Sequence, residues 1–453
     1  MKRLEKEATT EAIVAAIASD AAGRNSEVVD FIKLLDSIEG PYTLLLDAPW
    51  GDGKTFFIRS VEEVLKACNC NITTESDIEC GLQAMVKELA NIETSFLPFY
   101  FNAWENDYVE DPVIALLSNM ASSFDQESSV KERLPEKCIT SVIDAALAIS
   151  PFSIRTSEVA EAFSGDNLVK SYTKRRSLRM KINELAEESI VEVANKLVIF
   201  IDELDRCRPD FAVRLLEQTK SLFQSKDIVV VISADSLQLA NATEGLYGPR
   251  FNSQHFIERF FDQRMTLGPV DAYKVATGSP LQDTFDDYSR MAQELFSSRQ
   301  LTIRDCARIH DKITAGHVYC EKHDDGSTVS YVANNLFIPI LIFLEREDIE
   351  IFRRITRGAD TNAIYDYGSR CSCFVEVLDR AITREKRGFS PETMPSVTEE
   401  DRRRFVHNVC LLLFSAKRGG AEWCEAQRQI GYPRGLDYCV YKTLRFSEQG
   451  ERI

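Results

Sequence analysis

An apolar run that ends abruptly in a glycine-containing bend constrains the fold of this chain more than any other feature. Residues 43–55 read TLLLDAPWGDGKT: a strand pattern, then two glycines one residue apart, then a lysine and a threonine. The following residues, up to Cys68, have the apolar spacing of an amphipathic helix. Glycines in such a bend let the backbone curl with its N–H groups turned inward. The pattern therefore predicts a strand, a glycine loop and a helix in that order.

A loop of this kind is suited to a phosphate, because its N–H groups and the N-terminus of the following helix attract an anion. Gly51 and Gly53 let the backbone curl. Lys54 would reach the terminal phosphates, and Thr55 would offer its hydroxyl to magnesium. The residues predicted to contact the nucleotide are Pro49, Trp50, Gly51, Asp52, Gly53, Lys54, Thr55 and Phe56.

The loop departs from the full phosphate-loop pattern at one position. Ala48 stands where the pattern has its first glycine. A Cβ is tolerable there if φ is negative, because glycine is required only at positive φ. Asp52 lies inside the loop, so its carboxylate must point away from the phosphates. A strand–turn–helix with chance glycines is the alternative to a nucleotide site.

A second motif lies further along the chain. Residues 197–210 read LVIFIDELDRCRPD, in which five apolar residues lead into Asp202 and Glu203 at a predicted strand end. Placed beside the phosphate-loop strand, Asp202 would hold magnesium through water and Glu203 would polarise the attacking water. Glu203 and Lys54 are then the catalytic residues. A buried strand that ends in a polar turn is the alternative, but two motifs in this order favour nucleotide binding and hydrolysis.

The first 270 residues alternate between short apolar runs and helical patterns. Strands are predicted over 43–48, 96–104, 196–202 and 227–235, and the helices between and after them include 54–68, 111–124 and 209–223. Such alternation predicts an α/β fold with a parallel sheet and helices on both of its faces.

Two regions lie outside this alternation. Residues 125–195 read as a polar, mostly helical insertion, and after Pro269 the strand pattern gives way to helical spacing. The chain is therefore expected to divide into a nucleotide-binding domain over 1–270 and a mainly helical domain over 271–453.

The net charge of −17, from 71 acidic and 54 basic residues, disfavours a whole-molecule attraction to nucleic acid or anionic lipid. The basic stretch 170–181 reads as a solvated helix face, and binding of nucleic acid stays undecided. The twelve cysteines form no regular framework, which favours a reduced, cytoplasmic setting.

No membrane placement is expected from the sequence. The N-terminus has an apolar stretch of only about seven residues between acidic ones, unlike a signal peptide. The nearest candidate for a span, residues 138–152, carries Asp144 and is shorter than the roughly 20 residues that a membrane helix needs.

Four separated motifs resemble the KAP group of P-loop NTPases. They read DAPWGDGKTFF, FYFNAWENDY, VIFIDELDRCRPD and VVVISADSLQLANA, and they occur in the family's order. The family's loop falls on Trp50 to Thr55, its Phe-Asn-x-Trp strand end on Phe101 to Trp104, and its acidic run on Asp202 to Cys207. The segments AAGRNSEVVDFIKLL and FIERFFDQRMTL resemble its lead-in and its closing strand, so the resemblance covers about residues 20–270.

The resemblance implies a fold in the additional-strand division of P-loop NTPases, near the STAND and AAA+ proteins, which use ATP as a switch for assembly. Arginines that act on a neighbouring subunit are usual in such relatives. The candidates here are Arg206, Arg208 and Arg259, of which Arg259 is the best. Residues 23–25 either approach the adenine or form a simple turn. Many members carry membrane helices where this chain has the insertion 125–195.

Several further side chains have two interpretations. Trp104 is expected to pack in the fold, whereas Trp50 is left undecided. His317, Cys320 and His323 have a regular spacing that could serve zinc with Cys306 or the pair Cys371 and Cys373, but this spacing also arises by chance on a helix.

The leading hypothesis is a soluble ATPase that uses ATP and Mg²⁺ and whose cycle switches conformation or assembly. Protein partners in a multi-component system, and a homo-oligomer, follow from the resemblance, as does a role in bacterial defence against phage. The alternative is a nucleotide-gated scaffold with little turnover that acts through protein contacts. A nuclease within 271–453 is a third hypothesis, although no cluster of metal-ligating acids stands out there.

Overall fold

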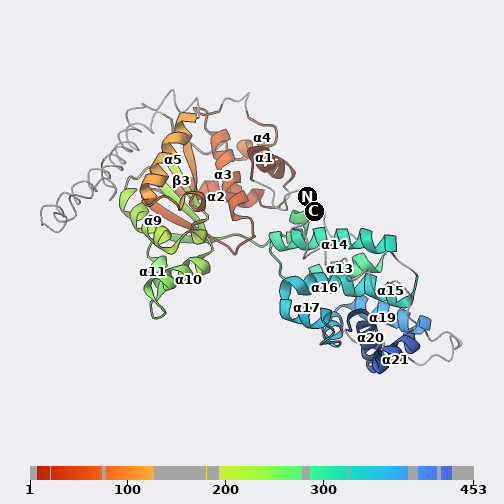
Figure 1. Cartoon of the computed structure of the whole chain (residues 1–453). Coiled ribbons are helices and arrows are strands. Elements are labelled where there is room, and N and C mark those ends of the chain that lie inside the picture. Colours follow the sequence, from red (N-terminus) through yellow and green to blue (C-terminus); the bar gives the residue numbers. More distant parts are fainter. Residues whose placement is uncertain are drawn as a thin grey trace. The chain divides into compact units, whose positions relative to one another are not determined.

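The computed structural model shows two compact units, Met1–Asp271 and Ala272–Ile453 (Figure 1). It describes residues 8–20, 22–73, 78–126, 180, 193–277, 286–323, 326–385, 396–415 and 420–430. The insertion predicted over 125–195 and the apolar stretch 138–152 lie almost wholly outside the described residues.

Helices and strands alternate along the first unit. In chain order its elements are α1 (Thr10–Ser19), α2 (Asn25–Ser37), β1 (Tyr42–Asp47), α3 (Lys54–Cys68), α4 (Gln83–Glu88), β2 (Phe96–Asn102), η2 (Trp104–Asn106), α5 (Pro112–Gln126), β3 (Lys196–Asp202), η6 (Leu204–Arg206), α9 (Pro209–Leu222), β4 (Ile228–Ala234), α10 (Ser236–Tyr247), α11 (Ser253–Glu258) and β5 (Gln263–Thr266).

The five strands are parallel and lie in the order β2-β3-β4-β1-β5. The prediction that the Asp202 strand lies beside the phosphate-loop strand is wrong, because β4 separates β3 from β1. All seven residues of β4 are buried, which suits a central position, but strand order depends on long-range pairing that no local pattern encodes. This inserted strand is the feature that defines the additional-strand division, so that expectation is confirmed.

Helices cover both faces of the sheet, as predicted. Alternate residues of β1 point to opposite faces, so that Leu44 and Leu46 join a core with α1, α2 and α3. Leu45 joins the core on the other face, which includes side chains of α5 and α9. Each face buries apolar side chains of β3 and β4 as well. The α/β fold class is therefore confirmed.

The second unit is helical throughout its described residues. Its elements are α12 (Ala272–Thr277), α13 (Asp287–Ser297), α14 (Ile303–His323), α15 (Thr328–Val332), the π-helical turn η7 (Ala333–Phe337), α16 (Ile338–Glu347), α17 (Ile349–Thr356), α18 (Ala363–Gly368), α19 (Ser372–Glu385), α20 (Glu399–Phe414) and α21 (Ala421–Ile430). They pack around one apolar core.

The helical run Thr328–Glu347 is long and apolar enough to cross a membrane by length and composition. The expectation that no segment reaches this length is therefore wrong. Of the apolar window in this run, 83% is buried inside the structure. Leu336, Phe337 and Leu341 from this run belong to the apolar core of the second unit, so its side chains are already used in packing.

Candidate functional site

The glycine loop follows β1 and ends at the first residue of α3. Gly51 and Gly53 have φ values of +95° and +86°, which residues with a Cβ rarely adopt. Among the described residues other than glycine, only Asp20 and Glu203 have positive φ. Ala48 therefore meets the condition under which its Cβ is tolerable, and the loop keeps a phosphate-loop shape without its first glycine.

Lys54 is buried and is held by its own loop. Its Nζ donates hydrogen bonds to the carbonyl oxygens of Ala48 and Pro49, the latter at 3.2 Å. A phosphate in the loop would replace these two carbonyls as the partner of the ammonium. Thr55 and Phe56 follow in the first turn of α3, where Thr55 is partly buried and Phe56 packs against the core.

Arg24 fixes the outer side of this loop. Its guanidinium donates to the carbonyl oxygen of Asp52 at 2.8 Å and to that of Gly268 at 3.1 Å. Glu27 accepts from the N–H of Gly268 at 3.1 Å and lies 3.7 Å from the Arg24 guanidinium. Burial lowers the pKa of Arg24, while Glu27 and Asp52 oppose that shift.

These contacts explain two features of the sequence. The positive charge of Arg24 offsets the negative charge that Asp52 brings into an anion-binding loop. Because the guanidinium is occupied by backbone oxygens and Asn25 binds the carbonyl of Ile17, the geometry favours the simple-turn interpretation of residues 23–25 over a direct contact with adenine.

Arg24→Ala is expected to lower the free energy of unfolding by about 1–3 kcal/mol, because Arg24 is only 7% exposed and its partners would lose a buried donor. Nucleotide affinity should fall as well, because the Asp52 carbonyl would no longer be held. Urea unfolding and equilibrium binding of a fluorescent ATP analogue measure the two effects. Lys33→Ala, on the exposed side of α2, is the control and should change neither.

Asp202 ends β3 in a buried position. In the sheet register it pairs with Asn102 of β2 and Ser233 of β4. Its carboxylate accepts from the Tyr100 hydroxyl at 3.1 Å and from the N–H of Glu203 at 2.9 Å. Burial and Asp202 together raise the pKa of Tyr100 well above its usual range, so the tyrosine remains a donor. Asp202 is thereby fixed with oxygens at the carboxyl edge of the sheet.

Glu203 has an unusual backbone and two side-chain partners. Its φ of +59° is uncommon for a residue with a Cβ, and such residues cluster at functional sites. One carboxylate oxygen lies 3.0 Å from Arg206 Nη1, and the other accepts from Asn102 Nδ2 at 3.4 Å. Burial raises the pKa of Glu203, and Arg206 acts in the opposite direction.

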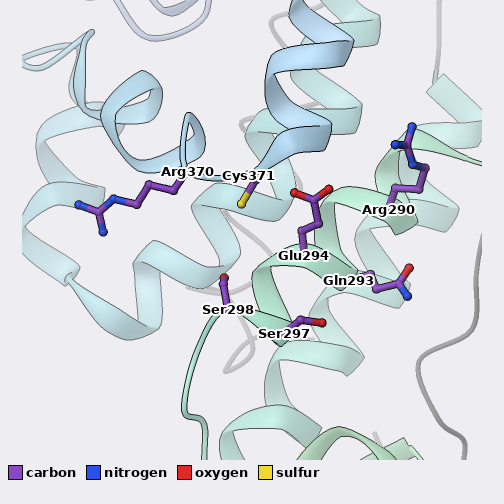
Figure 2. Close-up of a pocket in the computed structure, with 7 residues that line it drawn as sticks. All are labelled: Arg290, Gln293, Glu294, Ser297, Ser298, Arg370 and Cys371. Carbon is purple, nitrogen blue, oxygen red and sulfur yellow. The ribbon is translucent and has the colours of Figure 1, made fainter.

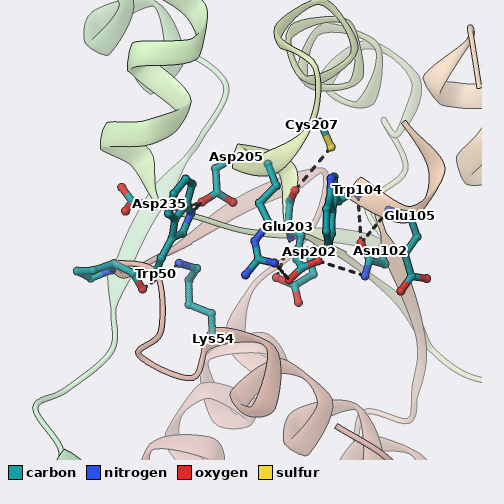
Figure 3. A network of polar contacts seen from close by, with 12 residues as sticks. Trp50, Lys54, Asn102, Trp104, Glu105, Asp202, Glu203, Asp205, Cys207 and Asp235 are labelled. Atoms are coloured by element: carbon teal, nitrogen blue, oxygen red, sulfur yellow. Dashed lines mark hydrogen bonds and ion pairs between the residues drawn. The ribbon is translucent and has the colours of Figure 1, made fainter. Parts of the chain in front are cut away.

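Asp205 joins the glycine loop to the acidic turn. Its carboxylate accepts from the indole N–H of Trp50 and, at 3.0 Å, from the backbone N–H of Asp235, which follows β4 and caps α10. Lys54 also acts on it, because the ammonium offsets part of the rise that burial causes in the pKa of Asp205. Figure 3 shows Trp50 and Lys54 of the loop facing the carboxylates that follow β3. The two predicted motifs thus lie together, although their strands are not neighbours.

The tryptophans differ from expectation. Trp104 is 51% exposed, so the prediction that it packs in the fold is wrong, and the Arg206 guanidinium lies 5.5 Å from its ring centroid. Trp50 is 45% exposed and uses its N–H on Asp205. Tyr100, Asn102 and Asp205 belong to the site but were not predicted to do so. All three stand inside the motifs already noted, which was the available signal.

The other two candidate arginines have partners elsewhere. Arg208 donates to the carbonyl oxygen of Asp107 at 3.1 Å. Arg259 is exposed, and its guanidinium lies 5.5 Å from the ring centroid of Phe256. Of the three, only Arg206 contacts Glu203 in the described part of the chain.

The oxygens of Thr55 and Asp202 suit Mg²⁺, which takes one or two protein oxygens together with phosphate and water. Within the described ranges, no three His, Cys, Asp or Glu side chains are grouped to hold a metal ion. His317 lies 3.4 Å from Asp286 and stacks on Tyr288, while the side chains of Cys320 and His323 lie outside the described residues.

The second unit has its own hollow of about 480 Å³, between α13 and the start of α19 (Figure 2). Its central carboxylate, Glu294, already accepts from the Ser372 hydroxyl at 2.7 Å and from the N–H of Cys373 at 3.0 Å. Arg290 in its wall pairs with Glu376 at 2.8 Å. Because these groups satisfy one another, the chemistry of the molecule is better sought in the first unit.

A family model described as the KAP family P-loop domain matches residues 24–293. This match includes both motifs and extends beyond residue 270, into α13. None of the curated proteins matches the chain. Among solved structures, that of PCH-2 from C. elegans is similar over 71% of this chain and 67% of its own, with 10% identity and a TM-score of 0.25. A likeness this low carries no argument about the fold.

Proposed function

This chain belongs to the KAP family of P-loop NTPases, and from that premise we propose that it binds and hydrolyses ATP with Mg²⁺ to switch its conformation or assembly. The family match supports nucleotide binding, and both motifs that would serve it lie in the first unit. Adenine is preferred to guanine because the chain has no Asn-Lys-x-Asp guanine signature.

Each site residue has a role that follows from its position. The curled loop and the N-terminus of α3 would hold the phosphates, and Lys54 would neutralise their charge. Thr55 and Asp202 would hold Mg²⁺, Asp202 through water, and the cation would offset charge on the transferred phosphoryl group. Glu203 would orient the attacking water and accept its proton.

The observation that carries this proposal is the contact between Trp50 and Asp205. It joins the lysine-bearing loop to the turn that carries Asp202 and Glu203. An anion site and an acidic cation site at one edge of a sheet are what phosphoryl transfer needs.

A nucleotide-gated scaffold with little turnover remains the second candidate. Both carboxylate oxygens of Glu203 have partners, and Lys54 is bound to loop carbonyls, so the site would have to rearrange before water could be activated. In this case nucleotide binding alone would set the conformation.

We further propose that the helical second unit binds protein partners and that the molecule acts in the cytoplasm. An oligomer in which Arg259 reaches a neighbouring subunit's nucleotide fits the exposed position of Arg259. A role in bacterial defence against phage rests on family analogy alone.

The direct test is phosphate release from ATP and from GTP by the full chain, with Mg²⁺ and with EDTA. Release that requires ATP and Mg²⁺ is the expected result. Sizing of the protein with and without a slowly hydrolysed ATP analogue then shows whether nucleotide controls assembly. Tight ATP binding without release would favour the scaffold, and no binding of either nucleotide would contradict both candidates.

A further inference from the structure

The residues around Glu203 support one inference that goes beyond the proposed function. We propose that Arg206 is a positioning residue for Glu203 and that the exposed ring of Trp104 holds Arg206 in place. This inference rests on the proposed role of Glu203 in activating water.

The carboxylate of Glu203 is held from two sides. Arg206, at the end of η6, lies 3.0 Å from one oxygen, and Asn102, at the end of β2, lies 3.4 Å from the other. Asn102 is itself fixed, because its Oδ1 accepts the backbone N–H groups of Trp104 and Glu105 at 3.1 and 3.2 Å. The plane of the Glu203 carboxylate is therefore set by groups on two different strand ends.

The backbone also restricts the direction in which Glu203 leaves the turn. Its left-handed conformation is fixed by its own N–H, which donates to Asp202 at 2.9 Å. Its carbonyl oxygen accepts from the N–H of Arg206 at 3.1 Å and from the Cys207 thiol at 3.6 Å. Three hydrogen bonds thus restrict the backbone of Glu203. Its remaining conformational freedom lies in the side chain, which Arg206 contacts.

Trp104 explains why the Arg206 side chain takes one conformation. A long arginine side chain loses considerable rotamer entropy when it is fixed. The guanidinium lies 5.5 Å from the centroid of the Trp104 ring, within the range of a cation–π contact. Trp104 is half-exposed, so core packing does not account for its orientation. Arg206 contacts both the Trp104 ring and the Glu203 carboxylate, which Figure 3 draws in one network, so η2 and η6 act together on one carboxylate.

Steady-state phosphate release by full-length variants tests this arrangement. Arg206→Gln is expected to lower kcat by about 10- to 100-fold, because misplacement of a catalytic group by an ångström can cost that much. The Kd for a slowly hydrolysed ATP analogue should stay within about twofold of the wild-type value, because Arg206 acts on the water-activating group and not on the nucleotide. Arg206→Lys keeps the charge and should recover a large part of kcat.

Trp104 should act only through Arg206. Trp104→Ala is expected to lower kcat several-fold and Trp104→Phe to preserve it. The double variant Trp104→Ala/Arg206→Gln should match Arg206→Gln alone, because residues that act as a unit are not additive. Two controls are matched to these changes: Arg214→Gln removes a half-buried arginine paired with Asp210 on α9, and Tyr108→Ala removes a 79% exposed aromatic ring.

The inference is overturned if Arg206→Gln keeps the wild-type kcat, if its main effect is a weaker Kd for the analogue, or if the Trp104 and Arg206 effects multiply. In each of these cases wild-type turnover is intact and the proposed function stands. A wild-type protein that binds ATP but releases no phosphate instead overturns the proposed hydrolysis, and this inference with it. Unfolding midpoints of all variants identify any loss that comes from misfolding.

Discussion

Glu203→Gln is expected to slow ATP hydrolysis by about 10²- to 10⁴-fold, the usual contribution of a general base. Glutamine has nearly the same shape, and its one carbonyl oxygen can still accept from Asn102 or from Arg206. It cannot accept a proton from water. Affinity for ATP should change little, because the proposed role of Glu203 is in water activation and its side-chain partners, Arg206 and Asn102, lie outside the glycine loop. Single-turnover phosphate release and analogue binding, measured on the same preparation, separate the two quantities.

The matched control for this change is Glu217→Gln, an exposed glutamate on α9, which should behave as wild type. Equal release by wild type and Glu203→Gln would remove Glu203 from the chemistry. If that equal rate were also close to zero, the scaffold would become the better account of the protein.

Lys54→Ala is expected to weaken ATP binding by at least about 30-fold, which corresponds to about 2 kcal/mol, the lower end of the cost of truncating one partner in a buried charge pair. Its ammonium is buried at the start of α3, and the hydrogen bonds that it makes within the described part of the chain go to neutral loop carbonyls, so its charge is available to a phosphate. Isothermal titration with an ATP analogue gives the affinity.

The exposed residue Lys87 of α4 supplies the control, and Lys87→Ala should bind as wild type. The unfolding midpoint of Lys54→Ala should fall modestly, because the buried Ala48 carbonyl loses its donor, whereas Pro49 is exposed and its carbonyl can turn to water. Unchanged ATP affinity in Lys54→Ala would mean that the glycine loop is not the nucleotide site.

Local patterns were sufficient for the elements that carry the chemistry. The strand before Gly51, the helix after Lys54 and the strand before Asp202 are each marked by a short apolar run with a distinct end. Such signals act over a few residues, which is why sequence alone could give them. The helical character of the second unit follows in the same way from apolar spacing.

Contacts between residues far apart in the chain could not be predicted from the sequence. The position of β4 depends on pairing with residues far away in the chain. Its seven residues contain no local pattern that predicts which strands lie beside it. Arg24 was placed near the nucleotide, yet its bonds to Asp52 and Gly268 join segments separated by up to 244 positions. Trp104 was misjudged because tryptophan usually packs inward, whereas here its ring lies against a charged side chain.

The strand β4, which lies between β1 and β3, determines how far apart the two motif-bearing strand ends are. Neighbouring strands lie about 4.8 Å apart, so the tips of β1 and β3 are about 9.6 Å apart. Mg²⁺ binds its oxygen ligands at about 2.1 Å. A Mg²⁺ ion bound to the Thr55 hydroxyl, with one water between it and Asp202, would span much of the distance between the two strand tips. β4 thus sets the distance between the two motif-bearing strands, and that distance leaves room for the hydrated metal ion that the proposed function requires.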